Sequence, residues 1–203
     1  IRGRLPHDAG DEGAVPRHGV ERILRYGFEQ ARRRSGRLAS VTKSNAQKYS
    51  MVFWDEVTEE LAAEYPDVTV TRYHVDAIAA RFIMQPETLD VVVASNLFGD
   101  ILSDIGAAVQ GGLGYAASAN INPQLDGPSM FEPVHGSAPD IAGDDSANPA
   151  AAIWSASMMF DLLGYEAIAK DILQALTRAA EDTANKTIGC QAYAQAVINR
   201  LQG

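Results

Sequence analysis

The fold class is decided by residues 90–109, which read DVVVASNLFGDILSDIGAAV. The three consecutive valines, Val91 to Val93, are typical of a short strand that is buried on both faces of a sheet. Ser95 can then cap a helix that continues to about Val109. A buried strand that leads directly into a helix is typical of α/β proteins, so this stretch predicts an α/β class.

Strands and helices alternate on both sides of this stretch as well. Upstream, apolar periodicity predicts helices at 19–34, 51–65 and 74–83 and strands at 38–42 and 68–73. Downstream, we expect short strands near Ser118 and Phe131 and helices at 148–163, 166–183 and 188–201. Because Gly111 and Gly112 interrupt the pattern, we expect two domains, residues 1–110 and 111–203.

Charge is distributed unevenly along the 203 residues, whose formal net charge is -9. Residues 1–40 contain nine arginines and five acids, whereas the stretch between Arg81 and Lys170 has eleven acids and no lysine or arginine. This pattern argues against a general nucleic-acid-binding protein, which needs a basic footprint for the phosphates. The acidic stretch suggests a bound cation instead, although composition alone favours a solvated acidic surface.

The cysteine content, the apolar runs and the start of the chain indicate the cellular compartment. One cysteine, Cys190, excludes an internal disulfide framework and a cysteine-rich zinc site. No apolar run reaches the roughly 18 residues that indicate a membrane span, and the arginine-rich start lacks the apolar core of a signal peptide. We therefore expect a cytoplasmic protein without membrane partners. Residue 1 is not methionine, so we also expect the chain to be a piece of a longer protein.

Two carboxylates, Asp100 and Asp104, are four residues apart on the helix predicted after the valine strand. That spacing places them one turn apart on the same face, with Leu97, Ile101 and Ile105 forming the apolar side. Oxygen ligands suit a hard divalent cation such as Mg²⁺ or Mn²⁺. A solvated acidic face is the commoner explanation of such a spacing.

Two further side chains follow predicted strands. Asp76 could be a third metal ligand, or a carboxylate that is stabilised by the positive end of a helix. Lys43 could act as a base if its surroundings favoured the neutral amine, or it could be an ordinary surface lysine. Taken alone, Asp76 is better explained as a carboxylate at the start of a helix, and Lys43 as a surface lysine.

A loop of small residues follows the strand predicted near Phe131. Residues 135–138 read HGSA, and backbone N–H groups in such a loop can approach an anion closely while His135 adds a donor. The loop is not a G-x-G-x-x-G fingerprint that opens a helix after a strand. Asp140 could accept hydrogen bonds from ribose hydroxyls, as an acid does in NAD sites.

Taken together, these segments resemble a known family. Residues 96–104, NLFGDILSD, and 131–143, FEPVHGSAPDIAG, are similar to the signatures of the isocitrate/isopropylmalate dehydrogenase family of metal-dependent decarboxylating dehydrogenases. The distance between them also fits, and the resemblance runs from about Arg17 to the C-terminus. The segments most similar to the tartrate/D-malate dehydrogenase branch are 19–26, 42–45, 53–56, 81–86 and 94–96.

The resemblance implies roles for individual residues. Lys43 matches the catalytic lysine, and Asp76, Asp100 and Asp104 match the metal ligands for Mg²⁺ or Mn²⁺, with K⁺ as an optional further cation. Lys43 and Asp76 would reach the partner's site in a homodimer with shared active sites. The resemblance places Asn45 near the nicotinamide and Asn148 at the adenine of the cofactor. The other positions that match the cofactor site are Glu132, His135, Gly136, Ser137, Ala138 and Asp140. An acid at position 140 would repel a 2′-phosphate, so the resemblance implies NAD.

The resemblance also implies a two-domain, isopropylmalate dehydrogenase-like fold. Residues 1–110 would form a small domain for dimerisation and the metal site, and residues 111–203 the C-terminal part of a large NAD-binding domain whose N-terminal part is lacking. That part would hold the arginines for the substrate carboxylates and the proton-donating tyrosine. The other seven acids of the basic-free stretch are expected to be solvated surface.

The implied reaction is the oxidative decarboxylation of a 2-hydroxy dicarboxylic acid, with D-malate or tartrate as the leading substrates and 3-isopropylmalate next. Two alternatives stay open, namely a truncated inactive remnant and a non-catalytic subunit of such a dehydrogenase. We also expect poor solubility of the chain alone, because helices after residue 148 would lack strands to cover their apolar faces.

Overall fold

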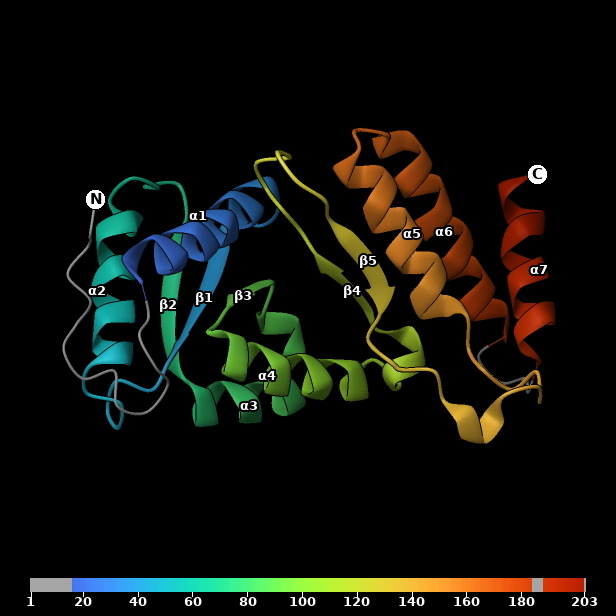
Figure 1. Cartoon of the computed structure of the whole chain (residues 1–203), viewed down its shortest axis with the longest axis horizontal. Coiled ribbons are helices and arrows are strands. Elements are labelled where there is room, and N and C mark those ends of the chain that lie inside the picture. Colours follow the sequence, from blue (N-terminus) through green and yellow to red (C-terminus); the bar gives the residue numbers. More distant parts are fainter. Residues whose placement is uncertain (1–15, 184–187, 203) are drawn as a thin grey trace. The chain divides into compact units, whose positions relative to one another are not determined.

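A parallel sheet forms the centre of the first of two units (Figure 1). The computed structural model describes residues 16–183 and 188–202. Within them, the sheet has the order β2-β1-β3. Its strands are β1 (Arg37–Thr42), β2 (Thr69–His74) and β3 (Val91–Val93). The accompanying helices are α1 (Arg17–Arg33), α2 (Ser50–Ala62), α3 (Val75–Met84) and α4 (Asn96–Val109). The predicted α/β class is therefore confirmed.

The core of the first unit lies against this sheet. Phe28 and Leu24 of α1 and Leu38 of β1 are among its fully buried side chains. Gly27 allows α1 to approach the sheet closely, because a Cβ at this position would lie 3.3 Å from the Cβ of Val93. The core thus depends on large side chains packed around parallel strands.

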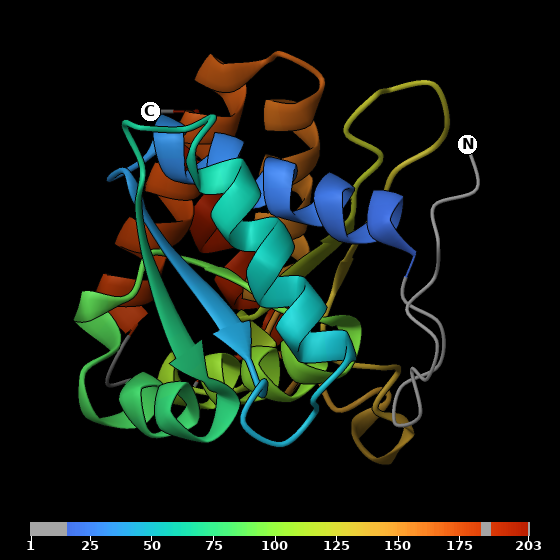
Figure 2. The ribbon, with the colours of Figure 1, turned by 90° about the vertical axis from the view of Figure 1, so that its left-hand side faces the viewer.

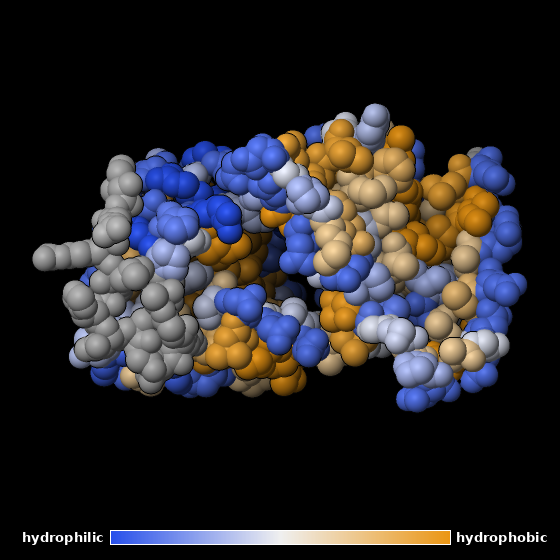
Figure 3. All heavy atoms as spheres, in the orientation of Figure 1, coloured by the Kyte–Doolittle hydropathy of each residue, from blue (hydrophilic) through white to orange (hydrophobic). Residues whose placement is uncertain are grey.

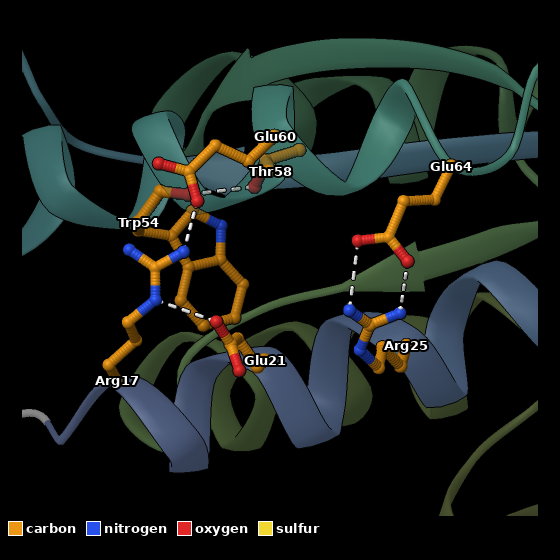
Figure 4. Close-up of polar contacts among 7 residues, drawn as sticks. All are labelled: Arg17, Glu21, Arg25, Trp54, Thr58, Glu60 and Glu64. Carbon is orange, nitrogen blue, oxygen red and sulfur yellow. Dashed lines mark hydrogen bonds and ion pairs between the residues drawn. The ribbon is translucent and has the colours of Figure 1, made fainter. Parts of the chain in front are cut away.

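Ion pairs join the exposed sides of α1 and α2 (Figure 4). Arg17 pairs with Glu21 of its own helix and with Glu60 of α2. Arg25 donates two hydrogen bonds to Glu64, at 2.7 and 2.9 Å. Each exposed pair contributes little alone, but together these contacts fix how α1 lies along α2. Part of the arginine-rich start is therefore neutralised by acids of the same unit.

The second unit begins at Ala107, inside α4. It combines the antiparallel strands β4 (Ala117–Asn120) and β5 (Met130–Pro133) with three helices. These helices are α5 (Ala150–Leu162), α6 (Glu166–Thr183) and α7 (Cys190–Leu201). The buried core is small and consists of Ala150, Ala175, Leu176, Ala179, Tyr193 and Val197. In the part of the chain that the structure describes, no helix has the length and apolar character that a bilayer crossing requires.

Each helix and strand predicted from the sequence is present, with ends that differ by a few residues, but two predictions for α4 are wrong. The Ser95 hydroxyl is buried without a hydrogen-bond partner, so it does not cap the helix. Leu97 and Ile101 are 53% and 50% exposed, whereas Phe98 and Leu102 are buried. The periodicity was consistent with either side of the helix, and packing against the sheet selects the Phe98 side.

The expectation that the remaining acids are solvated surface is wrong for Asp90. Its side chain is only 11% exposed. It accepts hydrogen bonds from the Ser35 hydroxyl, from Ser35 N–H at 3.1 Å and from Arg34 Nε at 2.6 Å. The Ser35 hydroxyl, followed by Arg34, lowers the pKa of this carboxyl. Asp90 thus fastens the end of α1 to the start of β3.

Asp145 is exposed, as expected, but it also organises the start of α7. Its carboxylate accepts from Gln191 N–H at 2.9 Å, and its carbonyl accepts from Cys190 N–H at 2.8 Å. A Cβ on the intervening Gly189 would lie 2.0 Å from an Asp145 carboxylate oxygen. The cap therefore requires both an acid at position 145 and glycine at position 189.

Candidate active site

Lys43 and Asp76 meet at the carboxyl edge of the parallel sheet. Figure 2 shows β1 and β2 running side by side to this edge, where α3 begins. Lys43 directly follows β1, and Asp76 lies in the first turn of α3, directly after β2. Lys43 Nζ donates to Asp76 Oδ1 at 2.5 Å. This hydrogen bond lowers the pKa of the Asp76 carboxyl. The carboxyl ends of parallel strands are where open α/β sheets place their sites.

A tight turn after β1 holds Lys43 in place. The Lys43 carbonyl accepts from Ala46 N–H at 2.9 Å and from Gln47 N–H at 2.8 Å. The Lys43 side chain is 26% exposed, so it is partly sheltered while still reaching the surface. Asn45, predicted to lie near the nicotinamide, is exposed in the same turn. Its cofactor role stays a prediction.

Two buried polar atoms at this edge had no site role predicted from the sequence, although Ser95 was predicted to cap α4. Neither His74 Nδ1 nor Ser95 Oγ has a hydrogen-bond partner among the described residues. Buried polar atoms in native proteins are nearly always paired with protein, water or a ligand. His74 ends β2 and Ser95 follows β3, so the one sequence signal for either was its place at a strand end. The edge therefore has more hydrogen-bonding capacity than one chain uses.

Asp100 and Asp104 are both exposed on α4, beside the exposed Leu97 and Ile101. Their oxygens suit a hard divalent cation, and the helical spacing lets two carboxylates face one ion. Residues 16–183 and 188–202 contain no group of three acidic, histidine or cysteine side chains that could hold a metal. Asp76 is thus kept with Lys43 and is not brought together with the α4 carboxylates in one chain. The metal-ligand roles of Asp76, Asp100 and Asp104 stay predictions.

The predicted cofactor loop follows β5 in the second unit. Glu132 lies within β5, and His135 Nδ1 is 3.0 Å from the carbonyl oxygen of Gly136. The backbone N–H groups of Gly136 and Ser137 donate to no backbone acceptor within the described ranges. Exposed, unpaired N–H groups in a small-residue loop are suited to an anion such as a diphosphate.

Ala138 gives this loop its shape. Its φ of 43° and ψ of 61° are left-handed, and the short 3-10 helix η3 (Pro139–Ile141) follows directly. A non-glycine residue in this conformation costs about 1–2 kcal/mol, and such strain gathers at functional loops. The turn leaves Asp140 exposed at the start of η3.

Asn148 has a structural role that its predicted adenine contact did not include. Its side-chain oxygen accepts from Ala150 N–H at 2.9 Å and so caps the start of α5. A Cβ on Gly114 would lie 2.9 Å from the Asn148 Cβ, which shows how closely the two segments pack. The amide nitrogen is the part of this side chain left for a ligand.

The strand-end lysine and acid, on a parallel sheet, point to an α/β enzyme, and comparison with known proteins specifies its family. The family model described as isocitrate/isopropylmalate dehydrogenase matches residues 7–197, so the chain belongs to this family. The resemblance noted in the sequence is therefore confirmed.

Comparison with individual relatives shows which members of the family the chain is similar to. The chain is 45% identical over 207 residues to a probable tartrate dehydrogenase/decarboxylase of Bacillus subtilis (strain 168), covering 99% of this chain and 58% of that protein. It is 56% identical over 154 residues to the D-malate dehydrogenase [decarboxylating] of Escherichia coli (strain K12), covering 75% of this chain and 43% of that protein. The chain thus spans about half the length of the curated relatives it matches.

A solved structure confirms the fold. Isocitrate dehydrogenase from Methylococcus capsulatus superposes with a TM-score of 0.86 at 38% sequence identity. The match covers 94% of this chain and 59% of that one. The isopropylmalate dehydrogenase-like fold expected from the sequence is therefore present over nearly the whole chain.

Proposed function

We propose that the chain belongs to an NAD- and divalent-metal-dependent dehydrogenase that oxidatively decarboxylates a 2-hydroxy dicarboxylic acid. D-malate and tartrate lead as substrates, with 3-isopropylmalate next, and the setting is cytoplasmic. The observation that carries the proposal is the Lys43–Asp76 pair at the carboxyl edge of the sheet. Similarity to tartrate and D-malate dehydrogenases supports the choice of substrate class.

The residues of the first unit divide the chemistry between them. Asp100 and Asp104, with Asp76 from the other subunit, would hold Mg²⁺ or Mn²⁺, and the metal would polarise a substrate hydroxyl and carboxylate. Lys43 accepts the hydroxyl proton at Nζ, a step that needs Nζ released from its ion pair with Asp76, because a neighbouring carboxylate favours the ammonium form. These steps need Lys43 and Asp76 to face the α4 carboxylates of another subunit, because one chain does not bring the four residues together.

The second unit holds the cofactor. NAD, when bound, is the hydride acceptor. The N–H groups of Gly136 and Ser137 bind its phosphates, with His135 as a further donor and Glu132 nearby on β5. Asp140 accepts hydrogen bonds from free ribose hydroxyls and disfavours a 2′-phosphate through charge repulsion.

A homodimer through α3 and α4 completes the proposal. Large apolar side chains on these helices are exposed, namely Ile83 at 67%, Met84 at 76%, Leu97 at 53% and Ile101 at 50%. Figure 3 shows hydrophobic residues gathered over α3 and α4 on one face of the first unit. Such a patch is typical of a surface that another protein covers. The patch includes the α4 side that carries Asp100 and Asp104.

Metal titration and turnover test the proposal. Calorimetric Mn²⁺ binding to the chain should weaken by at least roughly tenfold in Asp100→Asn or Asp104→Asn, and not in Asp161→Asn, which removes an exposed carboxylate of α5. With D-malate, NAD and Mn²⁺, Lys43→Ala should lower turnover by roughly 10²-fold or more, whereas Lys48→Ala, just after this turn, should not. Metal binding that ignores both α4 carboxylates would refute the ligand assignment.

A second candidate function is that of a truncated remnant or a non-catalytic subunit of such a dehydrogenase. Metal binding without turnover would favour it. Co-purification with a longer homologous chain that restores turnover would select the subunit.

A further inference from the structure

Two buried hydroxyls of β1 face α2 and have different partners. Ser40 accepts from Trp54 Nε1 at 3.0 Å and lies 3.4 Å from the Thr58 hydroxyl, which donates to the Trp54 carbonyl at 2.8 Å (Figure 4). The Ser40 hydroxyl is therefore used between β1 and α2. Thr42, the last residue of β1, is 3% exposed and connects the strand to the turn that carries Lys43.

The Thr42 hydroxyl fixes the backbone that follows Lys43. It accepts a hydrogen bond from Ser44 N–H at 3.2 Å, a local contact between side chain and backbone that is typical of threonine. It also donates to the Met51 carbonyl, in the first turn of α2, at 3.4 Å. The Lys43 carbonyl is held separately by two N–H groups of the turn. Hydrogen bonds thus hold the backbone at the lysine and at the residue after it.

The strand pairing relates the same residue to Asp76. In the pairing of β1 with β2, Thr42 lies opposite His74, and Asp76 lies in the first turn of α3, directly after β2. The Lys43 side chain is 26% exposed, and its Nζ donates to Asp76 Oδ1 at 2.5 Å. Because the four-carbon stem of lysine is flexible, the position of Nζ depends on where the backbone of Lys43 is held.

We infer that Thr42 is a positioning residue for Lys43, because its hydroxyl fixes the turn from which Nζ reaches Asp76. The hydroxyl acts on the backbone after the lysine and is not itself a reacting group. The inference rests on the proposed function only for the task of Lys43 in proton transfer, since the contact of Nζ with Asp76 is a feature of the chain itself. Removal of the hydroxyl should therefore loosen the turn and leave the Lys43 amine less often beside Asp76.

The test measures how fast the Lys43 amine of the full chain reacts with an amine-specific acylating reagent. Mass spectrometry gives this rate as a ratio to the rate at Lys48, an exposed lysine just after the turn. Thr42→Val keeps the branched shape and removes the hydroxyl. It should raise the ratio roughly threefold or more, the change that one lost hydrogen bond makes in an equilibrium. Thr42→Ser restores the hydroxyl and should return the ratio to that of the unaltered chain.

Two further comparisons separate positioning from a general loss of stability. Thr58→Val makes the same change at another buried threonine, whose hydroxyl bonds within α2, and it should leave the ratio unchanged. Asp76→Ala should itself raise the ratio, and adding Thr42→Val to it should raise the ratio no further, because Thr42 acts through this ion pair. Thr42→Ala, which removes the same hydroxyl, serves if the valine variant does not fold.

Three results would overturn the inference. They are an unchanged ratio in Thr42→Val, equal rises in Thr42→Val and Thr58→Val, and a further rise in the double variant with Asp76→Ala. The acylation uses no substrate, NAD or metal. Absence of turnover with D-malate would therefore count against the proposed reaction and not against the role of Thr42, and an unchanged ratio would do the reverse.

Discussion

The two units differ in the size of the side chains that hold them together. The first packs Phe28, Leu24, Trp54 and other large groups around a parallel sheet, whereas half of the six core residues of the second are alanines. Hydrophobic stabilisation grows with the apolar area removed from water, so the first unit should be the more stable. The residues proposed for metal binding and proton transfer lie in that unit, and the proposed cofactor loop lies in the other. The comparison predicts that the unit with the proposed metal and proton-transfer residues resists unfolding more than the unit with the cofactor loop.

The largest expected loss of stability comes from a substitution in the core of the first unit. Phe28 is fully buried and stacks on Tyr65 with ring centroids 4.7 Å apart. Phe28→Ala should lower the free energy of unfolding of the first unit by about 3–5 kcal/mol, against about 2 kcal/mol for Leu176→Ala in the second. Urea titrations followed by Trp54 fluorescence in a Trp154→Phe background, and the reverse, report on each unit separately. An equal or larger loss for Leu176→Ala would contradict the comparison.

An intermediate effect depends on pH and concerns the first unit. Asp90→Asn should cost about 2 kcal/mol at pH 7, because it weakens charge-assisted hydrogen bonds to a nearly buried carboxylate. The folded-state pKa is lowered, so this stabilisation is complete above the ordinary aspartate pKa of about 3.9 and is lost as pH falls through the lower value. Urea titrations at pH 7 and at pH 2–3 should show the difference between the two proteins shrinking in acid. Asp161→Asn, which alters an exposed carboxylate, serves as the control and should show no such trend.

The smallest expected effect on stability concerns two glycines of the second unit. Gly189→Ala would force a methyl group into the Asp145 carboxylate and should remove the α7 cap, at a cost of about 1 kcal/mol. Gly136→Ala meets no atom within 4 Å and should leave stability nearly unchanged. Thermal melts that rank these two variants the other way would refute the capping role. Hydrogen exchange at the start of α7 should rise only in Gly189→Ala.

The sequence predicted the elements well and their packing less well. Periodicity is a local property, so each α-helix and strand of the described residues was predicted, but it showed neither the short 3-10 helices nor that α4 packs through Phe98 and Leu102. Asp90 looked like a surface acid because its partner Ser35 is 55 residues away in the chain. Contacts of this kind depend on which strands pair, and spacing alone does not report strand pairing.

In the candidate site, too, the residue types could be predicted from the sequence but their contacts could not. Lys43 and Asp76 are 33 residues apart and meet only because β1 and β2 run parallel and in register. Residue types identified both as candidates, and resemblance assigned their roles, but neither predicted a direct ion pair within one chain. The orphaned atoms of His74 and Ser95 could not be found from the sequence, because burial without a partner is a property of the fold.

The Lys43–Asp76 contact also has a genetic consequence under the proposed dimer. These two residues are carried by one subunit into a site whose other half, Asp100 and Asp104, is carried by the second. Mutant alleles then fall into two complementation groups. A mixed dimer of Lys43→Ala and Asp100→Asn subunits regains one intact site, whereas a mixture of Lys43→Ala and Asp76→Asn regains none.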